Sequence, residues 1–152
     1  MSEPVHGTAV LVGSDGVLIR GESGAGKSLL AFTLIERGGR LIADDRLMLS
    51  ACHGRLVGTA PAAIAGRIEL RGRGVVTLPH ERGAVIRLVA DVVDEEGLER
   101  MPEPHHLSTA LLGITLPRQP VPGAPDRAVR LIETALGALA ALPKEGLRSE
   151  RV

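Results

Sequence analysis

The chain has 152 residues, of which 44% are hydrophobic and 24% charged, proportions that are typical of one folded globular domain and exclude a disordered chain. Its 18 basic and 18 acidic side chains cancel, and Phe32 is the only aromatic residue, so general nucleic-acid binding is not expected. The sequence has no signal-peptide pattern and no apolar run of membrane-spanning length, so we expect a cytoplasmic protein without a membrane partner.

The first predicted elements form a β-hairpin. Residues 8–12 (TAVLV) and 17–20 (VLIR) have the composition of strands, and residues 13–16 (GSDG) between them have that of a tight turn. His6 stands just before this hairpin, where an exposed histidine without a role is the ordinary interpretation. The second strand leads directly into the most informative segment of the chain.

That segment, residues 21–28 (GESGAGKS), matches the pattern G-x-x-x-x-G-K-[S/T] in full. Its glycines permit backbone angles that let successive N–H groups converge on a phosphate, at the positive end of a following helix. In this pattern Lys27 reaches the β- and γ-phosphates and the Ser28 hydroxyl holds Mg²⁺. A purely structural glycine-rich turn is the alternative. The predicted nucleotide-binding residues are Gly21, Glu22, Ser23, Gly24, Ala25, Gly26, Lys27 and Ser28.

Two carboxylates follow the next predicted strand. A helix is expected from about residue 26 to the glycine pair 38–39, and a short strand over residues 40–43. This strand ends on Asp44 and Asp45, and the carboxyl ends of strands in α/β sheets face the ligand crevice. One carboxylate there could orient Mg²⁺, and the other could accept a proton from an attacking hydroxyl. An acidic pair that merely forms a turn is the alternative.

The middle of the chain contains a second predicted hairpin and a charged segment. The hairpin comprises residues 46–50 and 55–57, and Cys52 between them is expected to be a small buried side chain. After a loop or a single helical turn, residues 67–74 (RIELRGRG) place Glu69 among arginines and glycines. Glu69 has the chemistry of a metal ligand, and the arginines have that of phosphate contacts. A strand edge with solvated charges explains the same pattern equally well.

The third quarter of the chain contains the longest predicted strand, over residues 84–93. Residues 94–104 are acidic and interrupted by glycine and prolines, which predicts a surface loop. The adjacent pair His105 and His106 lacks a third ligand at metal-binding spacing and receives no role. Residues 114–116 are expected to form a last short strand.

The C-terminal part is predicted to end in one helix. Three prolines exclude residues 119–125 from regular structure, and the apolar pattern predicts a helix over residues 128–142 with Asp126 as its N-cap. A polar tail follows. The expected organisation is therefore one domain over residues 1–143 and a tail over residues 144–152.

Four segments of the sequence occur in an order that is characteristic of one protein family. They are His6-Gly7, residues 21–28, residues 37–47 (RGGRLIADDRL) and residues 68–78 (IELRGRGVVTL). Together they resemble the catalytic domain of the HPr kinase/phosphorylase family, over nearly the whole chain. The resemblance implies an α/β P-loop kinase domain with a mixed sheet, similar in fold to phosphoenolpyruvate carboxykinase. It also implies ATP-dependent phosphorylation of a serine on an HPr-type phosphocarrier protein of the phosphotransferase system.

The resemblance also implies roles for individual residues. ATP and Mg²⁺ are the cofactors, with residues 21–28 around the phosphates and with Ser28 and Glu69 as the Mg²⁺ ligands. Asp45 matches the catalytic base of the family. The implied catalytic residues are His6, Lys27, Asp44, Asp45 and Arg100, and Arg100 stands in surroundings that differ from those in the family.

Two departures from the family pattern lead to further expectations. The family usually has an additional domain before the histidine, whereas here five residues precede His6, so a short kinase-domain form is expected. Residues 120–125 lack two arginines that the family associates with dephosphorylation, which argues against phosphorylase activity. The family tends to form oligomers, but the residues do not decide whether this chain does.

Two other functions are compatible with a phosphate-binding loop. One is a kinase or ATPase acting on a small molecule; a closed pocket beside Asp45 would favour it, whereas an open surface would favour a protein substrate. The other is a nucleotide-sensing regulator without turnover. The combination of His6, Asp45 and Glu69 argues against a sensor, because a sensor needs no catalytic base.

Overall fold

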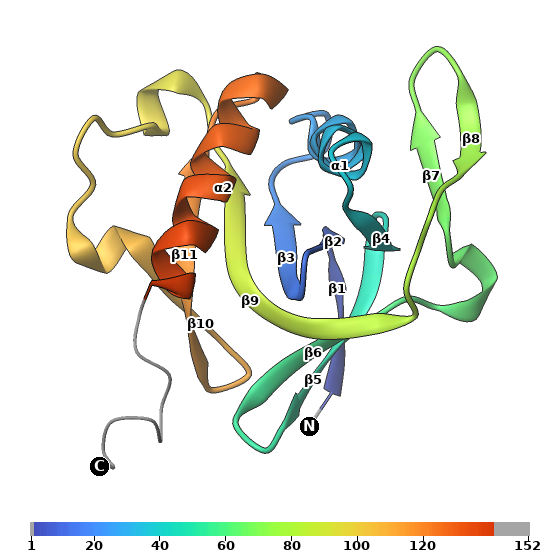
Figure 1. Ribbon diagram of the computed structural model, residues 1–152, viewed down its shortest axis with the longest axis horizontal. Helices are drawn as coiled ribbons and strands as arrows, with labels where there is room; N and C mark the ends of the chain where they lie inside the picture. Colours follow the sequence, from blue (N-terminus) through green and yellow to red (C-terminus); the bar gives the residue numbers. More distant parts are fainter. Residues whose placement is uncertain (1, 142–152) are drawn as a thin grey trace.

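The computed structural model describes residues 2–141, and its main feature is a strongly curved mixed sheet of nine strands (Figure 1). The strands of this sheet are β1 (Ser2–His6), β2 (Thr8–Val12), β3 (Asp15–Arg20), β4 (Arg40–Ala43), β5 (Arg46–Cys52), β6 (Arg55–Thr59), β9 (Gly83–Val92), β10 (Ser108–Leu111) and β11 (Ile114–Val121). A separate hairpin comprises β7 (Arg67–Leu70) and β8 (Gly74–Thr77), and the helices are α1 (Lys27–Glu36) and α2 (Pro125–Ala140). Three short 3₁₀ turns, η1 (Ala62–Ile64), η2 (Glu95–Gly97) and η3 (Pro104–Leu107), lie in the connections.

The long strand β9 is the centre of this sheet. The strand order is β1–β5–β6–β9–β3–β2–β4, and β11 pairs with β9 while β10 pairs with β11. The first residues of β9 pair antiparallel with β6, residues 86–91 pair parallel with β3, and residues 89–92 pair parallel with β11. Its bend is visible in Figure 1. Because β9 bridges these partners, it joins the two β-hairpins of the N-terminal half to the C-terminal elements.

The sheet has an apolar core on each face. Helices α1 and α2 pack on one face, where Leu30 and Leu34 of α1 and Ile132 of α2 are buried together with Ile19 of β3 (Figure 1). The opposite face closes on itself as the sheet curves, and its buried residues include Leu18, Ile42, Leu47, Leu49, Leu56 and Ile86. Strands β3 and β4 contribute to both cores, so the loops at their carboxyl ends begin from rigid positions.

Several elements expected from the sequence are confirmed. The hairpin β2–β3 is present as predicted, although β3 begins at Asp15 inside the expected turn and Val12 pairs with Asp15, and β5–β6 is the second predicted hairpin. Helix α1 ends at Glu36 before the glycine pair, as the glycines predicted. These elements have strong local patterns, which is why they could be recognised without tertiary information.

The prediction for residues 119–125 is wrong, because β11 continues to Val121. Along residues 118–121 this strand pairs only with β9 in the described part of the chain, and the Val121 carbonyl accepts a hydrogen bond from Val93 N–H. Residues that bond to one neighbour alternate along a strand, so the missing N–H of Pro120 falls on the side without a partner. The prolines are therefore compatible with this strand.

The predicted N-cap of the last helix is also wrong. Helix α2 begins at Pro125 with Ala124 as N-cap, and Asp126 lies in its first turn. Proline suits the first helical position because its φ is already helical and its missing N–H has no partner there. The predicted end of this helix at residue 142 and the predicted tail over residues 144–152 lie outside the described residues.

Two strands and one exposed side chain were not anticipated. Strands β1 (SEPVH) and β10 (STAL) have no alternating apolar pattern and form by pairing with β5 and β11. Cys52, expected to be buried, is exposed at the end of β5, next to the hairpin turn. Within residues 2–141 no helix is long and apolar enough to cross a membrane.

Candidate functional site

The loop between β3 and α1 presents backbone donors to solvent. Helix α1 begins at Lys27, and its N-cap Gly26 has a φ of 105° and no side chain capping the helix. Gly24 also has a positive φ of 83°, and a Cβ there would meet nothing within 4 Å. Within residues 2–141 no side chain caps the first N–H groups of α1, so they could bind an anion, which the positive end of the helix favours.

The Lys27 side chain folds back over this loop. Its Nζ donates hydrogen bonds to the carbonyl oxygens of Gly21 at 2.7 Å and Glu22 at 3.0 Å. The ammonium group is thus held over the loop, and within residues 2–141 it has no carboxylate partner. A phosphate that enters the loop would exchange these two neutral acceptors for charged oxygens, which form stronger hydrogen bonds.

Asp44 is the centre of a small polar cluster beside the start of α1. Its Oδ1 accepts hydrogen bonds from the hydroxyls of Ser28 and Thr8, each at 2.9 Å. Its Oδ2 accepts a longer one, 3.4 Å, from the backbone N–H of Glu69 on β7. Three elements far apart in the sequence therefore meet at one carboxylate, with the Ser28 hydroxyl facing it.

Asp45 differs sharply from its neighbour. It is exposed, has a φ of 72°, and its carboxylate makes no hydrogen bond or ion pair within residues 2–141. Its carbonyl accepts from Gly7 N–H at 3.1 Å, and the adjacent Arg46 is opposite His6 in the β1–β5 register. The structure thus brings the His6-Gly7 segment beside Asp45, and it leaves the Asp45 carboxylate accessible.

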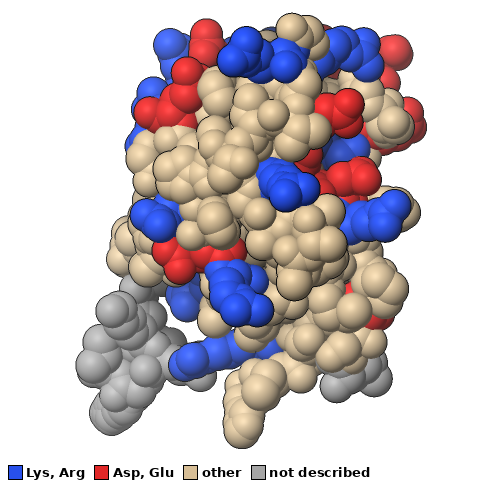
Figure 2. Space-filling model, turned by 90° about the vertical axis from the view of Figure 1, so that its right-hand side faces the viewer, with Lys and Arg blue, Asp and Glu red and all other residues tan. Residues whose placement is uncertain are grey.

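The hairpin β7–β8 stands beside α1 at the edge of the molecule (Figure 1). Ile68 is buried in the core under the helices, which anchors the hairpin, while Glu69 is exposed. Arg71 and Arg73 lie in the turn of the hairpin and are exposed. Basic and acidic side chains are interspersed on the face of the molecule seen in Figure 2.

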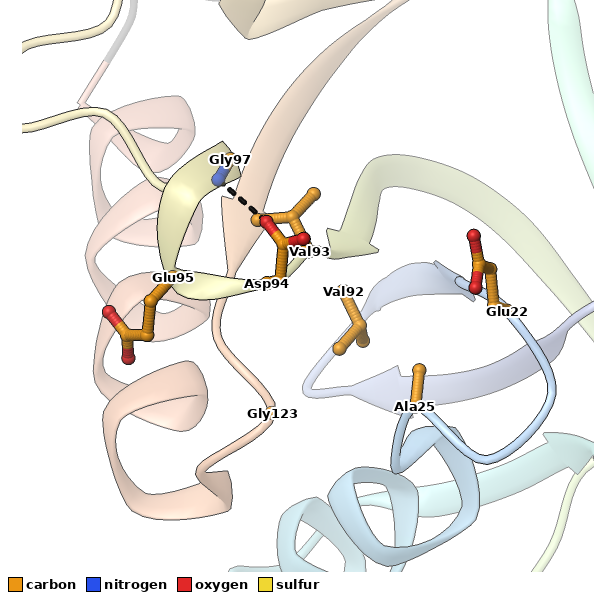
Figure 3. A pocket seen from close by; sticks show the side chains of 8 residues that line it. All are labelled: Glu22, Ala25, Val92, Val93, Asp94, Glu95, Gly97 and Gly123. Atoms are coloured by element: carbon orange, nitrogen blue, oxygen red, sulfur yellow. Dashed lines mark hydrogen bonds between the residues drawn. The ribbon is translucent and has the colours of Figure 1, made fainter.

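A hollow of about 610 Å³ opens next to the glycine-rich loop (Figure 3). Glu22 and Ala25 of the loop lie on one side, and the end of β9 with the following Asp94 lies on the other. The Asp94 carboxylate accepts a hydrogen bond from Gly97 N–H at 2.8 Å, which holds the η2 turn. The hollow is large enough for a small organic group beside the glycine-rich loop.

Comparison with known proteins identifies the family. Residues 1–150 match the family described as the HPr Serine kinase C-terminal domain. The chain belongs to this family. It is 37% identical over 147 residues to an HPr kinase/phosphorylase of Geobacillus thermodenitrificans and 34% identical over 138 residues to one of Clostridium beijerinckii. Each alignment covers 84% of this chain and 45% of the relative, so the chain spans about half the length of these relatives.

A solved structure, described as the Hpr(Ser) kinase/phosphatase from Coxiella burnetii, has the same fold. It superposes with a TM-score of 0.81 and 26% sequence identity, and the match covers 91% of this chain and 99% of that one. The mixed α/β fold expected from the sequence is therefore confirmed for this member of the HPr Serine kinase C-terminal domain family.

Arg100 is the one predicted site residue that the structure places apart from the others. It lines a second hollow of about 590 Å³ between the 95–107 connection, β11 and α2, together with Arg127 and Arg130. No contact joins it to the glycine-rich loop or to Asp44 within the described residues. Its catalytic role stays a prediction from the family resemblance.

A charged network that the sequence did not reveal lies at the end of β3, directly before the glycine-rich loop. Arg20, the last residue of β3, donates from Nε and Nη2 to Asp91 on β9, at 2.7 and 2.9 Å. Arg118 on β11 donates to the same carboxylate and to the His106 carbonyl. Burial raises the pKa of Asp91, but hydrogen bonds and charge from Arg20 and Arg118 outweigh burial, so its pKa is lowered overall. This charged network exists only because β3, β9 and β11, which are distant in the sequence, pair side by side. Its residue Arg20 immediately precedes Gly21.

Asp91→Asn is expected to lower the melting temperature at neutral pH. It should also make the melting temperature fall less when the pH is lowered. A pKa held below the ordinary 3.8 means that the ionised carboxylate stabilises the fold above that pH, and that this stability is lost as the pH falls through the folded-state pKa. Asparagine cannot ionise, so the variant should lose less stability than the wild type on acidification. Melting curves recorded from neutral to acidic pH test this.

Glu133→Gln is the matched control, because it removes an exposed ion pair with Arg37. Exposed pairs contribute little to stability, so its melting temperature should stay close to that of the wild type. An Asp91→Asn protein with the wild-type acid profile would show that this network does not stabilise the fold.

Proposed function

We propose that this chain is an ATP-dependent serine kinase domain that phosphorylates an HPr-type phosphocarrier protein. The observation that carries the proposal is the arrangement around Asp44. Lys27 begins a helix without a side-chain cap, the Ser28 hydroxyl donates to Asp44, and the neighbouring Asp45 carboxylate is exposed and has no partner among residues 2–141. The names of the relatives support it, since they are called HPr kinase/phosphorylase or Hpr(Ser) kinase/phosphatase.

Residues 21–28 would act as a P-loop for the triphosphate. The N–H groups of α1 and the Lys27 ammonium fit an anion, because in the described part of the chain no side chain caps the helix and no carboxylate bonds to Lys27. The hollow next to Glu22 and Ala25 is the place that we assign to the nucleoside. This nucleotide site would be of the type found in phosphoenolpyruvate carboxykinase.

The donors around Asp44 also fit Mg²⁺. The Ser28 hydroxyl and the carboxylates of Asp44 and Glu69 would supply oxygen ligands, which Mg²⁺ prefers, and the backbone N–H of Glu69 already contacts Asp44. Within residues 2–141 no three or more His, Cys, Asp or Glu side chains are placed to hold a metal by themselves. That agrees with Mg²⁺ sites in kinases, where phosphate oxygens and water complete the coordination. When bound, Mg²⁺ would neutralise charge on the phosphates.

The two aspartates would then have different tasks. Asp44 is bound by three donors and would orient the Ser28 hydroxyl and the metal side of the site. Asp45 is exposed and its carboxylate has no partner in the described residues, so it is suited to accept the proton of an incoming serine hydroxyl. His6 is exposed on the strand next to Asp45, where it would contact the same substrate.

The exposure of the residues around Asp45 favours a protein substrate over a small molecule. His6, Asp45 and Glu69 are all exposed, so the acceptor side of the site is an open surface. A small acceptor would need an enclosing pocket around the reacting hydroxyl to exclude water. We therefore propose the P-loop on one side for ATP and this open surface for the carrier.

The test is phosphorylation of a carrier followed by intact mass. Purified protein, Mg²⁺-ATP and the HPr-type proteins of the same organism are mixed, and a gain of one phosphate on one carrier is expected. The gain should disappear in the variant of that carrier with alanine in place of the target serine. ATP binding with no gain on any carrier would contradict the proposal and favour a small-molecule kinase or a nucleotide sensor. Inorganic phosphate added afterwards should not reverse the reaction, since residues 120–125 contain no arginine.

A further inference from the structure

Thr8, the first residue of β2, is the one buried polar side chain among residues 2–141, with 1% of its surface exposed. Valine has the same shape and would suit a buried strand position at least as well. The hydroxyl of Thr8 therefore calls for an explanation other than packing. Its hydrogen bonds supply one.

The Thr8 hydroxyl contacts both aspartates of the site. Its Oγ1 donates to Asp44 Oδ1 at 2.9 Å and accepts from the backbone N–H of Asp45 at 3.3 Å. A hydroxyl has one proton and two lone pairs, so it can make both hydrogen bonds at once. Within the described chain no other side chain bonds to both residues.

The second contact acts on an unusual backbone conformation. Asp45 has a φ of 72°, a left-handed conformation that residues with a side chain rarely adopt unless their surroundings hold them there. Two backbone hydrogen bonds help, from Gly7 N–H to the Asp45 carbonyl and from Arg46 N–H to the Asp44 carbonyl. Thr8 accepts the remaining N–H of this turn, that of Asp45 itself.

The left-handed turn separates the environments of the two carboxylates. Asp44 is half-buried and accepts from Ser28, Thr8 and Glu69, whereas Asp45 is exposed and its carboxylate has no partner in residues 2–141. Relaxation of the turn would let the chain path at Asp44 and Asp45 shift, and both carboxylates would move relative to Ser28.

We propose that Thr8 is a positioning residue that separates the roles of Asp44 and Asp45. Its proton orients Asp44 toward Ser28, and its lone pair holds Asp45 in the left-handed turn that leaves its carboxylate free. Its effect on the rate depends on the proposed kinase function, but the contact itself does not.

The contact is tested first without any nucleotide, by melting curves. Thr8→Val should lower the melting temperature by roughly 3–8 °C, because the Asp45 N–H loses its acceptor and Asp44 loses a donor. In an Asp44→Ala background the same substitution should lower it by clearly less. Thr59→Val, in a half-buried strand position without a side-chain hydrogen bond in the described chain, is the control and should change little. Equal losses from Thr8→Val in both backgrounds would overturn the proposal.

The role in positioning is tested by separating rate from affinity. Thr8→Val should lower kcat for phosphate transfer roughly 10- to 100-fold, as misplacement of catalytic groups does. Its Kd for Mg²⁺ and a non-hydrolysable ATP analogue, from calorimetry, should rise by a smaller factor than kcat falls, because Lys27 and the glycine-rich loop are unchanged. Thr8→Ser keeps the hydroxyl and should restore most of kcat.

A Thr8→Val protein with wild-type kcat, or a Thr8→Ser protein as slow as Thr8→Val, would overturn the positioning role. If Thr8→Val does not fold, Thr8→Ala replaces it, and equal rates for the alanine and serine variants would overturn the proposal. If the wild-type protein itself transfers no phosphate, the proposed function fails. In that case the melting experiment still decides whether Thr8 couples to Asp44.

Discussion

Asp45→Asn is expected to slow phosphate transfer by roughly 10²- to 10⁴-fold, the usual contribution of a general base. Affinity for Mg²⁺-ATP and the melting temperature should both stay close to those of the wild type. The physical reason is that the Asp45 carboxylate is exposed and unbound within residues 2–141, so its removal breaks no contact of the fold. Transfer rates, calorimetric Kd values and melting curves measure the three quantities.

Asparagine is the right substitution because it tolerates the left-handed conformation that residue 45 adopts, with its φ of 72°. Alanine would add backbone strain and confuse stability with chemistry. Asp44→Asn is the informative comparison, since Asp44 is hydrogen-bonded to Ser28 and Thr8 and its replacement should weaken both folding and Mg²⁺-nucleotide binding. An Asp45→Asn protein that transfers phosphate at the wild-type rate would remove Asp45 from the mechanism.

Lys27→Met should abolish measurable transfer and reduce affinity for Mg²⁺-ATP. Methionine matches the length of the lysine stem but removes the charge that would face the β- and γ-phosphates. Loss of one donor to a developing charge costs on the order of 10²- to 10³-fold in rate, and loss of ground-state phosphate contacts adds to it. Binding of a fluorescent ATP analogue and single-turnover transfer assays test both effects.

The melting temperature without nucleotide should change little, because the Lys27 bonds to the Gly21 and Glu22 carbonyls are exposed. Arg37→Met provides the control: it removes a positive charge just past the other end of α1, where the arginine pairs with Glu133 on the surface. That variant should bind nucleotide and transfer phosphate as the wild type does. Wild-type affinity in Lys27→Met would mean that the loop does not bind the triphosphate as proposed.

Much of the fold could be predicted from the sequence because its signals are local. The hairpin β2–β3, helix α1 and the long strand β9 are each apolar runs bounded by glycines or polar turns. Strands β1 and β10 have no such pattern, and they form because a neighbouring strand offers its free edge. The end of β11 was missed for a related reason, since Pro120 is acceptable only where one side of the strand has no partner.

The sequence by itself determined the candidate residues of the site: the glycine-rich loop with Lys27 and Ser28, and the acidic pair that follows β4. Tertiary structure alone decided which aspartate contacts Ser28. That choice depends on the left-handed turn at Asp45, which contacts from Gly7 and Thr8 hold in place. A sequence pattern records which groups are present at short spacing, whereas the orientation of a carboxylate is set by hydrogen bonds from strands that are distant in the chain.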